Sequence, residues 1–141
     1  MSEPRGPRAG VETTPGHQDV RLRGRTYAVP FEDVWQAALG LADGQERGWR
    51  LLSANDQTGV ICATATRRFP EAVDDVVVRI SLDDDAQTRV DARAAAREGG
   101  TAVRRNTRRL VKFFNALDTA VAQAATQRRS TRASDASARA E

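Results

Sequence analysis

The chain has 141 residues, which is the size of one domain. Its 22 basic and 19 acidic side chains leave a formal net charge of +3, an excess that permits an acidic partner but does not require one. One cysteine excludes an internal disulfide, and no apolar run reaches the roughly 18 residues of a membrane span. Since no signal peptide is visible, we expect a soluble cytoplasmic protein without a transmembrane segment.

Both ends of the chain have compositions that disfavour a packed core. Residues 1–19 are rich in Pro, Gly, Glu and Thr, and residues 126–141 are rich in Arg, Ala and Ser. Neither segment carries enough large apolar side chains to offset the entropy lost on ordering. We therefore predict a disordered N-terminal tail over 1–19, a single folded domain over 20–125 and a disordered C-terminal tail over 126–141.

Between these ends, strand and helix patterns follow one another. Leu22 alternates with arginines in residues 20–29, which favours a first strand. Pro30 then begins a helix that runs to about residue 46, with apolar side chains at helical spacing. Further strands are predicted, separated by short polar turns, at residues 49–54, 60–66, 72–82 and 88–94. A second amphipathic helix follows over residues 101–125.

This order of elements predicts the fold class. Short hairpin turns make the four middle strands antiparallel neighbours. Two amphipathic helices can cover only one face of the resulting sheet. We therefore expect an α+β two-layer sandwich of order β-α-β-β-β-β-α, with both helices packed on one face of an antiparallel sheet.

Several segments resemble a known family in their order and spacing. They are residues 27–35 (YAVPFEDVW), 48–50 (GWR), 58–59 (TG), 73–79 (VDDVVVR, after Phe69), 89–93 (RVDAR) and a pattern R-x-G-x(6)-N-x-x-R formed by Arg97, Gly99, Asn106 and Arg109. Together they are similar to the domain of unknown function 1499 family over about residues 26–117. The resemblance implies no activity, because the family has no established one. A Cys-Pro-x-x-Pro-Asn-Cys segment that often begins its members is missing here.

Few residues of the chain have the setting that catalysis requires. His17 is the only histidine and lies in the predicted tail, where no fixed partner positions it as a general base. Cys62 lies within a predicted strand, without the helix terminus or cation that a reactive thiolate needs. The run of aspartates at residues 83–85 lacks the spacing of a calcium loop. We therefore predict no enzyme activity, no cofactor and no metal site, with a site built on Asp74 and arginines as the enzymatic alternative.

Asp74, Arg97 and Asn106 are candidate binding residues. Asp74 shares strand phase with Val76, so its carboxylate needs a partner, for which an arginine of the hairpin or the last helix is expected. Arg97 leads through two glycines into that helix, an arrangement similar to an anion-binding loop but without a phosphate-loop motif, and Thr101 is expected to cap the helix. Asn106 is expected to bond strand backbone or a loop, which would pin the helix to the sheet.

The second helix carries a basic face. Opposite its apolar stripe lie Arg104, Arg105, Arg108, Arg109 and Lys112. A solvated, partly paired surface is the plain interpretation, and the scarcity of stacking aromatics disfavours nucleic acid. We therefore expect a non-catalytic binding or scaffold domain for a protein, a peptide or a small apolar ligand, through the uncovered sheet face or the space between the layers. The alternative is an anion-binding module for nucleic acid or acidic lipid headgroups, through these arginines.

Overall fold

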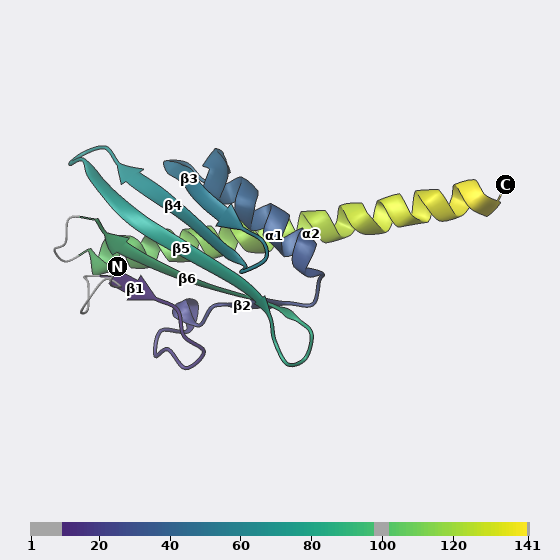
Figure 1. The fold of residues 1–141 in the computed structure, drawn as a ribbon, viewed down its shortest axis with the longest axis horizontal. Helices are drawn as coiled ribbons and strands as arrows, with labels where there is room; N and C mark the ends of the chain where they lie inside the picture. The colour runs from purple at the N-terminus through teal and green to yellow at the C-terminus, as the bar shows by residue number, and fades with distance from the viewer. Residues whose placement is uncertain (1–9, 98–101, 141) are drawn as a thin grey trace.

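The computed structural model describes residues 10–97 and 102–140 of the chain. Within these residues, six strands, two α-helices and two short helical turns follow one another (Figure 1). They are β1 (Gly10–Glu12), a 3-10 helix η1 (Val20–Leu22), β2 (Arg25–Tyr27), α1 (Phe31–Gly40), a π-helical turn η2 (Leu41–Gln45), β3 (Trp49–Asn55), β4 (Val60–Arg67), β5 (Ala72–Leu82), β6 (Thr88–Ala96) and α2 (Val103–Ala140).

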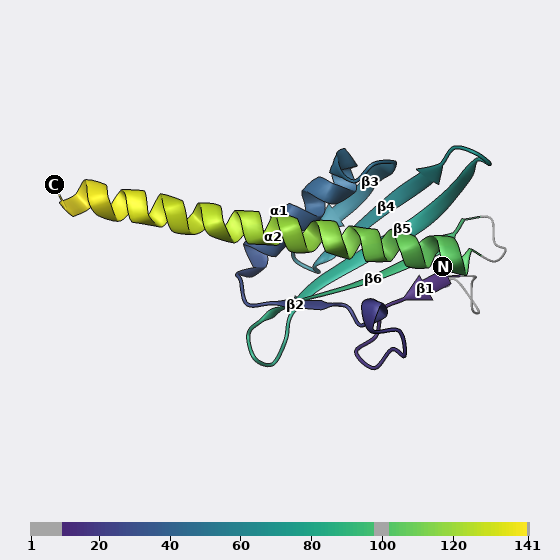
Figure 2. The same ribbon diagram turned by 180° about the vertical axis from the view of Figure 1, so that it is seen from behind.

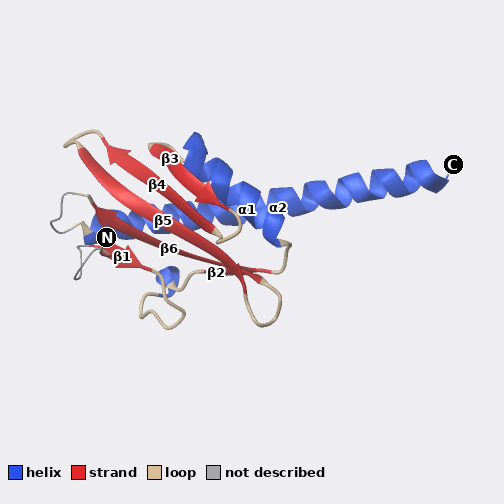
Figure 3. Ribbon diagram, in the orientation of Figure 1, coloured by secondary structure: helices blue, strands red, loops and turns tan. Residues whose placement is uncertain are grey.

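The strands form one antiparallel sheet of order β1-β6-β5-β4-β3, and β2 also pairs with β6, along the same edge as β1. Both α-helices lie on one face of this sheet. Figure 2 shows α2 running across that face, and Figure 3 shows the opposite face without a helix. The predicted α+β architecture with two helices on one face of an antiparallel sheet is therefore confirmed.

Apolar side chains of α2 fill the space between the two layers. Those without any exposed surface are Leu110, Phe113, Phe114 and Leu117. Opposite them, β4 and β6 present alanines such as Ala63 and Ala94, whose small side chains leave room for the two phenylalanine rings. The Trp49 ring of β3 stacks on Phe113 with 5.0 Å between ring centroids. The interlayer space is thus occupied by the core of the protein.

The N-terminal segment differs from its prediction. The expected disordered tail over 1–19 is wrong for residues 10–19, because β1 pairs with β6 and Val11 is buried in the core. The expected strand over 20–29 is reduced to β2, and Val20–Leu22 is a 3-10 helix capped by Asp19, whose side chain accepts from the Arg21 amide. Backbone hydrogen bonds and one buried side chain hold β1 to the sheet. Because so few of its side chains are apolar, hydrophobic patterning in the sequence does not reveal this strand.

The C-terminal segment also differs. Residues 126–140, expected to be a disordered tail, continue α2 as helix, and this part projects beyond the sheet (Figure 1). Alanine, arginine and glutamine are strong helix formers, so the helix extends without an apolar stripe to anchor it. Among the described residues, no helix combines the length and the apolarity needed to cross a membrane.

Candidate anion-binding site

Asp74 of β5 is the centre of a buried ion-pair cluster on the helix-facing side of the sheet. Its side chain has no exposed surface. Arg105 binds it in a bidentate manner, with Nη2 2.6 Å from Oδ1 and Nε 2.9 Å from Oδ2, and Arg109 donates from Nη2 to Oδ2 at 3.0 Å. The prediction that an arginine of the hairpin or the last helix partners Asp74 is therefore correct, and two helix arginines do so.

The two arginines determine the charge state of Asp74. Burial by itself would raise the pKa of this carboxyl, because it disfavours the ionised form. The hydrogen bond from Arg105 and the positive charges of Arg109 and Arg105 outweigh burial, so the pKa of Asp74 lies below its ordinary value. The carboxylate is consequently ionised at neutral pH and fixes both guanidinium groups in place.

Asn106 lies next to this cluster, fully buried on α2. Its Oδ1 accepts a hydrogen bond from Arg109 Nε at 3.4 Å, whereas its Nδ2 finds no partner among the described residues. The expected bond to strand backbone or a loop is therefore not the one formed. Asn106 instead accepts from the Nε–H of Arg109, next to the Nη2 group through which Arg109 binds Asp74.

A pocket of about 680 Å³ opens beside the cluster. Its lining residues come from the end of β4 and from the first turns of α2. Figures 1 and 2 show the β4–β5 hairpin turn and the start of α2 at the same end of the molecule. It is lined by Arg67, Ala102, Arg104, Arg105, Arg108, Arg109 and Lys112. Six of the seven lining side chains are cations, and we call this site the arginine pocket.

The carboxylates around the arginine pocket neutralise only part of its charge. Six cations line it, and two carboxylates pair with them: Asp74 as described, and buried Glu46, whose Oε1 lies 3.4 Å from Lys112 Nζ. This leaves a charge of +4, one unit more than the +3 of the whole chain. Outside the pocket, the remaining charges of the protein therefore nearly cancel.

The position of the cations on α2 opposes helix stability. Arg104 and Arg105 lie in the first turn, where the partial positive charge of the helix N-terminus disfavours cations. Arg104 and Arg108 are also one turn apart, a spacing at which like charges repel by about 0.2–0.5 kcal/mol. Asp74 compensates Arg105 but not Arg104 or Arg108. Arg104 and Arg108 thus destabilise the start of α2, and core packing does not explain why arginines occupy these positions.

The other predicted residues lie elsewhere. Arg97 pairs with Asp75 at 2.7 Å on the open face of the sheet, so the structure does not bring it into the pocket. The glycines between it and α2, and the expected Thr101 cap, lie outside the described residues. His17 lies in the ordered segment before η1, where its Nδ1 accepts from the Asp19 amide at 3.0 Å. Cys62 is half-buried on the open face.

The aspartates at residues 83–85 form a turn, as the sequence predicted. Asp83 closes the β5–β6 turn by accepting from the amides of Asp85 and Gln87. In the part of the chain that the structure describes, no group of three His, Cys, Asp or Glu side chains could hold a metal ion.

Arg67 is the pocket residue that sequence reasoning missed. It ends β4, 37 positions before Arg104, and reaches the pocket only because the hairpin folds beside α2. The one available signal was the Arg67-Arg68 doublet, which composition alone assigns to a solvated turn.

These features define a small two-layer α+β domain with an arginine-lined surface pocket. Over residues 6–117, the chain matches the family described as a protein of unknown function, DUF1499. Because this match covers most of its length, the chain belongs to that family, and the resemblance found in the sequence is confirmed. The arginine pocket lies within the matched region, and the projecting end of α2 lies beyond it. No curated protein and no solved structure matches the chain.

Proposed function

We propose that the protein is a non-catalytic, cytoplasmic binding module that holds a phosphate-class anion in the arginine pocket. The observation that carries this proposal is the net charge of +4 gathered around one pocket in a chain whose total is +3. Guanidinium groups present planar forks of N–H donors that match phosphate and carboxylate oxygens.

Two classes of arginine support the proposal in different ways. Arg105 and Arg109 are held by Asp74, so they supply oriented positive charge with little loss of side-chain entropy on binding. Arg67, Arg104 and Arg108 have no carboxylate partner within the described residues. Apart from the Nε–H of Arg67, which donates to the Phe69 carbonyl oxygen, their N–H groups are available to a ligand. A ligand with several anionic oxygens matches this arrangement best.

This proposal departs from the partner that the sequence favoured. The space between the layers is occupied by Leu110, Phe113, Phe114 and Leu117. We therefore do not propose an apolar ligand between the layers. A protein or peptide partner on the open sheet face stays a prediction. The anion-binding alternative now ranks first, because the basic residues converge on one pocket instead of forming an evenly solvated face.

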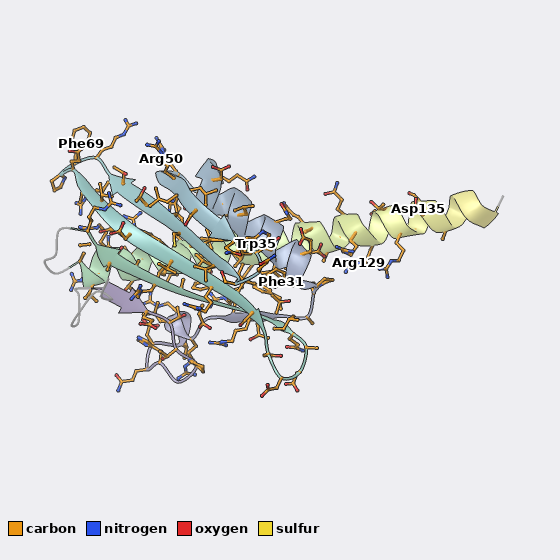
Figure 4. The ribbon with its side chains drawn as sticks, viewed as in Figure 1. Phe31, Trp35, Arg50, Phe69, Arg129 and Asp135 are labelled. Carbon is orange, nitrogen blue, oxygen red and sulfur yellow. The ribbon has the colours of Figure 1, made fainter. Side chains whose placement is uncertain are left out.

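Calorimetric titration with pyrophosphate at low salt tests the proposal. We expect saturable binding that Arg104→Glu/Arg108→Glu weakens by at least about tenfold, because reversing two charges makes the pocket four units more negative. The matched control is Arg129→Glu/Arg132→Glu, which makes the same charge change on the projecting end of the same helix (Figure 4). The control should bind like the unmodified protein.

Two results would contradict the proposal. One is the absence of pyrophosphate binding at low ionic strength, where screening is weakest. The other is an equal loss of affinity in the pocket variant and in the control, which would mean that net charge rather than the pocket attracts the anion. The pocket variant should remain folded, since an acidic residue in the first turn of α2 is favourable by about 0.3–1 kcal/mol.

A further inference from the structure

Phe69 has no role in the core. It is 86% exposed, more than any other large apolar side chain in the described part of the chain. It lies in the turn between β4 and β5, and Figure 4 shows its ring at the outer end of the sheet, with Arg50 at the same end. A phenylalanine ring gains stability only when it leaves water. The exposed ring is therefore available for a contact outside this chain.

The turn that carries Phe69 is also a wall of the arginine pocket. Arg67, which lines the pocket, donates from Nε to the Phe69 carbonyl oxygen at 3.3 Å. At the start of α2, Val103 is 51% exposed and lies in the chain between Ala102 and Arg104, which both line the pocket. Exposed apolar side chains and uncompensated cations thus occur together at one end of the molecule.

Building on the proposed anion-binding function, we propose that this end docks on an anionic lipid bilayer. Phe69 enters the apolar edge of the leaflet while the arginine pocket holds a headgroup phosphate. An interfacial membrane site combines apolar side chains that reach the acyl boundary with cations at headgroup level, and each cation near an anionic leaflet adds to the attraction. Arg68, exposed beside Phe69, increases the positive charge at headgroup level.

The same features fit a bilayer better than a nucleic acid. Single-strand binders stack successive bases on several aromatic side chains. Phe69 is the one exposed aromatic among the described large apolar side chains, and the exposed apolar side chain at the start of α2 is the aliphatic Val103. Valine offers no stacking surface for a base but partitions into a lipid interface. The pairing of one aromatic with one aliphatic side chain therefore favours lipid.

Co-sedimentation of the full chain with vesicles tests the docking. The vesicles are phosphatidylcholine containing about 30% phosphatidylserine, with pure phosphatidylcholine as the neutral comparison. We expect binding to the anionic vesicles only, weakened about tenfold or more by Phe69→Ala and restored by Phe69→Trp. Leu82→Ala is the matched control, because Leu82 is also exposed, at 60%, but ends β5 far from the Phe69 turn. It should bind like the unmodified protein.

Pyrophosphate titration of the same variants separates the two proposals. Phe69→Ala should bind pyrophosphate normally, while Arg104→Glu/Arg108→Glu should lose both pyrophosphate and vesicles. If vesicle binding is absent, or is the same in Phe69→Ala as in the unmodified protein, the docking proposal is wrong. The anion-binding proposal is unaffected by that result. If the protein does not bind pyrophosphate, the proposed function is wrong. Vesicle binding by a protein that does not bind pyrophosphate would show that docking does not involve the arginine pocket. Phe69-dependent retention of a single-stranded oligonucleotide, without vesicle binding, would replace lipid by nucleic acid.

Discussion

Asp74 and Asp75 are adjacent in the chain and experience opposite environments. Successive side chains of a strand point to opposite faces of the sheet, so Asp74 turns toward α2 and Asp75 toward the uncovered face. Both pair with arginine, but Asp74 is fully buried and Asp75 is partly exposed. Burial therefore decides how much each pair contributes to folding.

The buried position of Asp74 predicts a large effect of neutralising it. Asp74→Asn should lower the free energy of unfolding by about 3 kcal/mol, because Arg105 and Arg109 lose the charge that compensates them. Asp75→Asn, the neighbouring control, should lower it by less than about 1 kcal/mol, as expected for an exposed ion pair. Chemical denaturation at pH 7 measures both. Equal effects of the two substitutions would contradict the assignment of Asp74 as the structural centre of the cluster.

The same pair predicts a pH dependence. The pKa of Asp74 in the folded protein lies below its unfolded-state value of about 3.9. The stabilisation by this carboxylate is therefore complete above that value and is lost as the pH falls through the folded-state pKa. The gap in unfolding free energy between the unmodified protein and Asp74→Asn should close in this acidic window. If the difference in unfolding free energy between the two proteins is unchanged down to pH 2, protonation of Asp74 does not cause the loss of stability.

At the scale of elements, β1 shows how a short edge strand joins a core. Three residues pair with β6, and Val11 is the one side chain of β1 that reaches the hydrophobic core. Just after β1, Thr13 Oγ1 donates to Asp91 Oδ1 at 2.9 Å and accepts from the Ala92 amide at 3.0 Å. Residues 10–19 are thus part of the folded unit.

Val11 gives a direct measure of this attachment. Val11→Ala should cost about 2 kcal/mol of unfolding free energy, since it removes buried methyl groups and leaves a small cavity. Val20→Ala makes the identical change at a side chain that is 64% exposed, and should cost less than about 0.5 kcal/mol. Thermal or denaturant unfolding compares them. Indistinguishable stabilities would show that β1 does not hold to the sheet in solution.

At the scale of the whole molecule, α2 serves two different regions. Its first half supplies the core and the arginine pocket, and Tyr27 and Asp118 join it to β2 through a hydrogen bond of 2.6 Å. Its last buried core residue is Val121. Beyond that point the helix projects from the sheet, and Arg128 anchors it through an ion pair to Asp33 of α1 (Figure 4 labels neighbouring Arg129).

This division predicts the outcome of truncation. Removing residues 130–141 should leave the unfolding free energy within about 0.5 kcal/mol, because residues 130–136 are exposed and Arg128 is retained. Removing 118–141 should destabilise the protein by several times that amount, because it also deletes Val121 and the Asp118 partner of Tyr27. Circular dichroism melts compare the two deletions. A large loss from the shorter deletion would show that the projecting helix packs on the domain.

The sequence by itself determined the elements whose signals are local. Alternating side chains predicted β4 to β6, and helical spacing predicted α1 and the first half of α2, because these periodicities follow from the geometry of each element. The end of the first helix and the polar turn that follows bounded β3. The inward phase of Asp74 followed from the same rule, and with it the need for an arginine partner from the hairpin or the last helix. The order of elements was enough to place both helices on one face of the sheet.

The tertiary structure alone decided the site. Asp74 meets Arg105 and Arg109 across 31 and 35 positions of the chain, and Arg67 completes the pocket only when the hairpin folds beside α2. It also decided β1, whose backbone hydrogen bonds to β6 depend little on side-chain identity. Local periodicity reports which way a side chain faces. Which distant side chains converge there depends on chain packing, and that convergence turned a basic helix face into an arginine pocket.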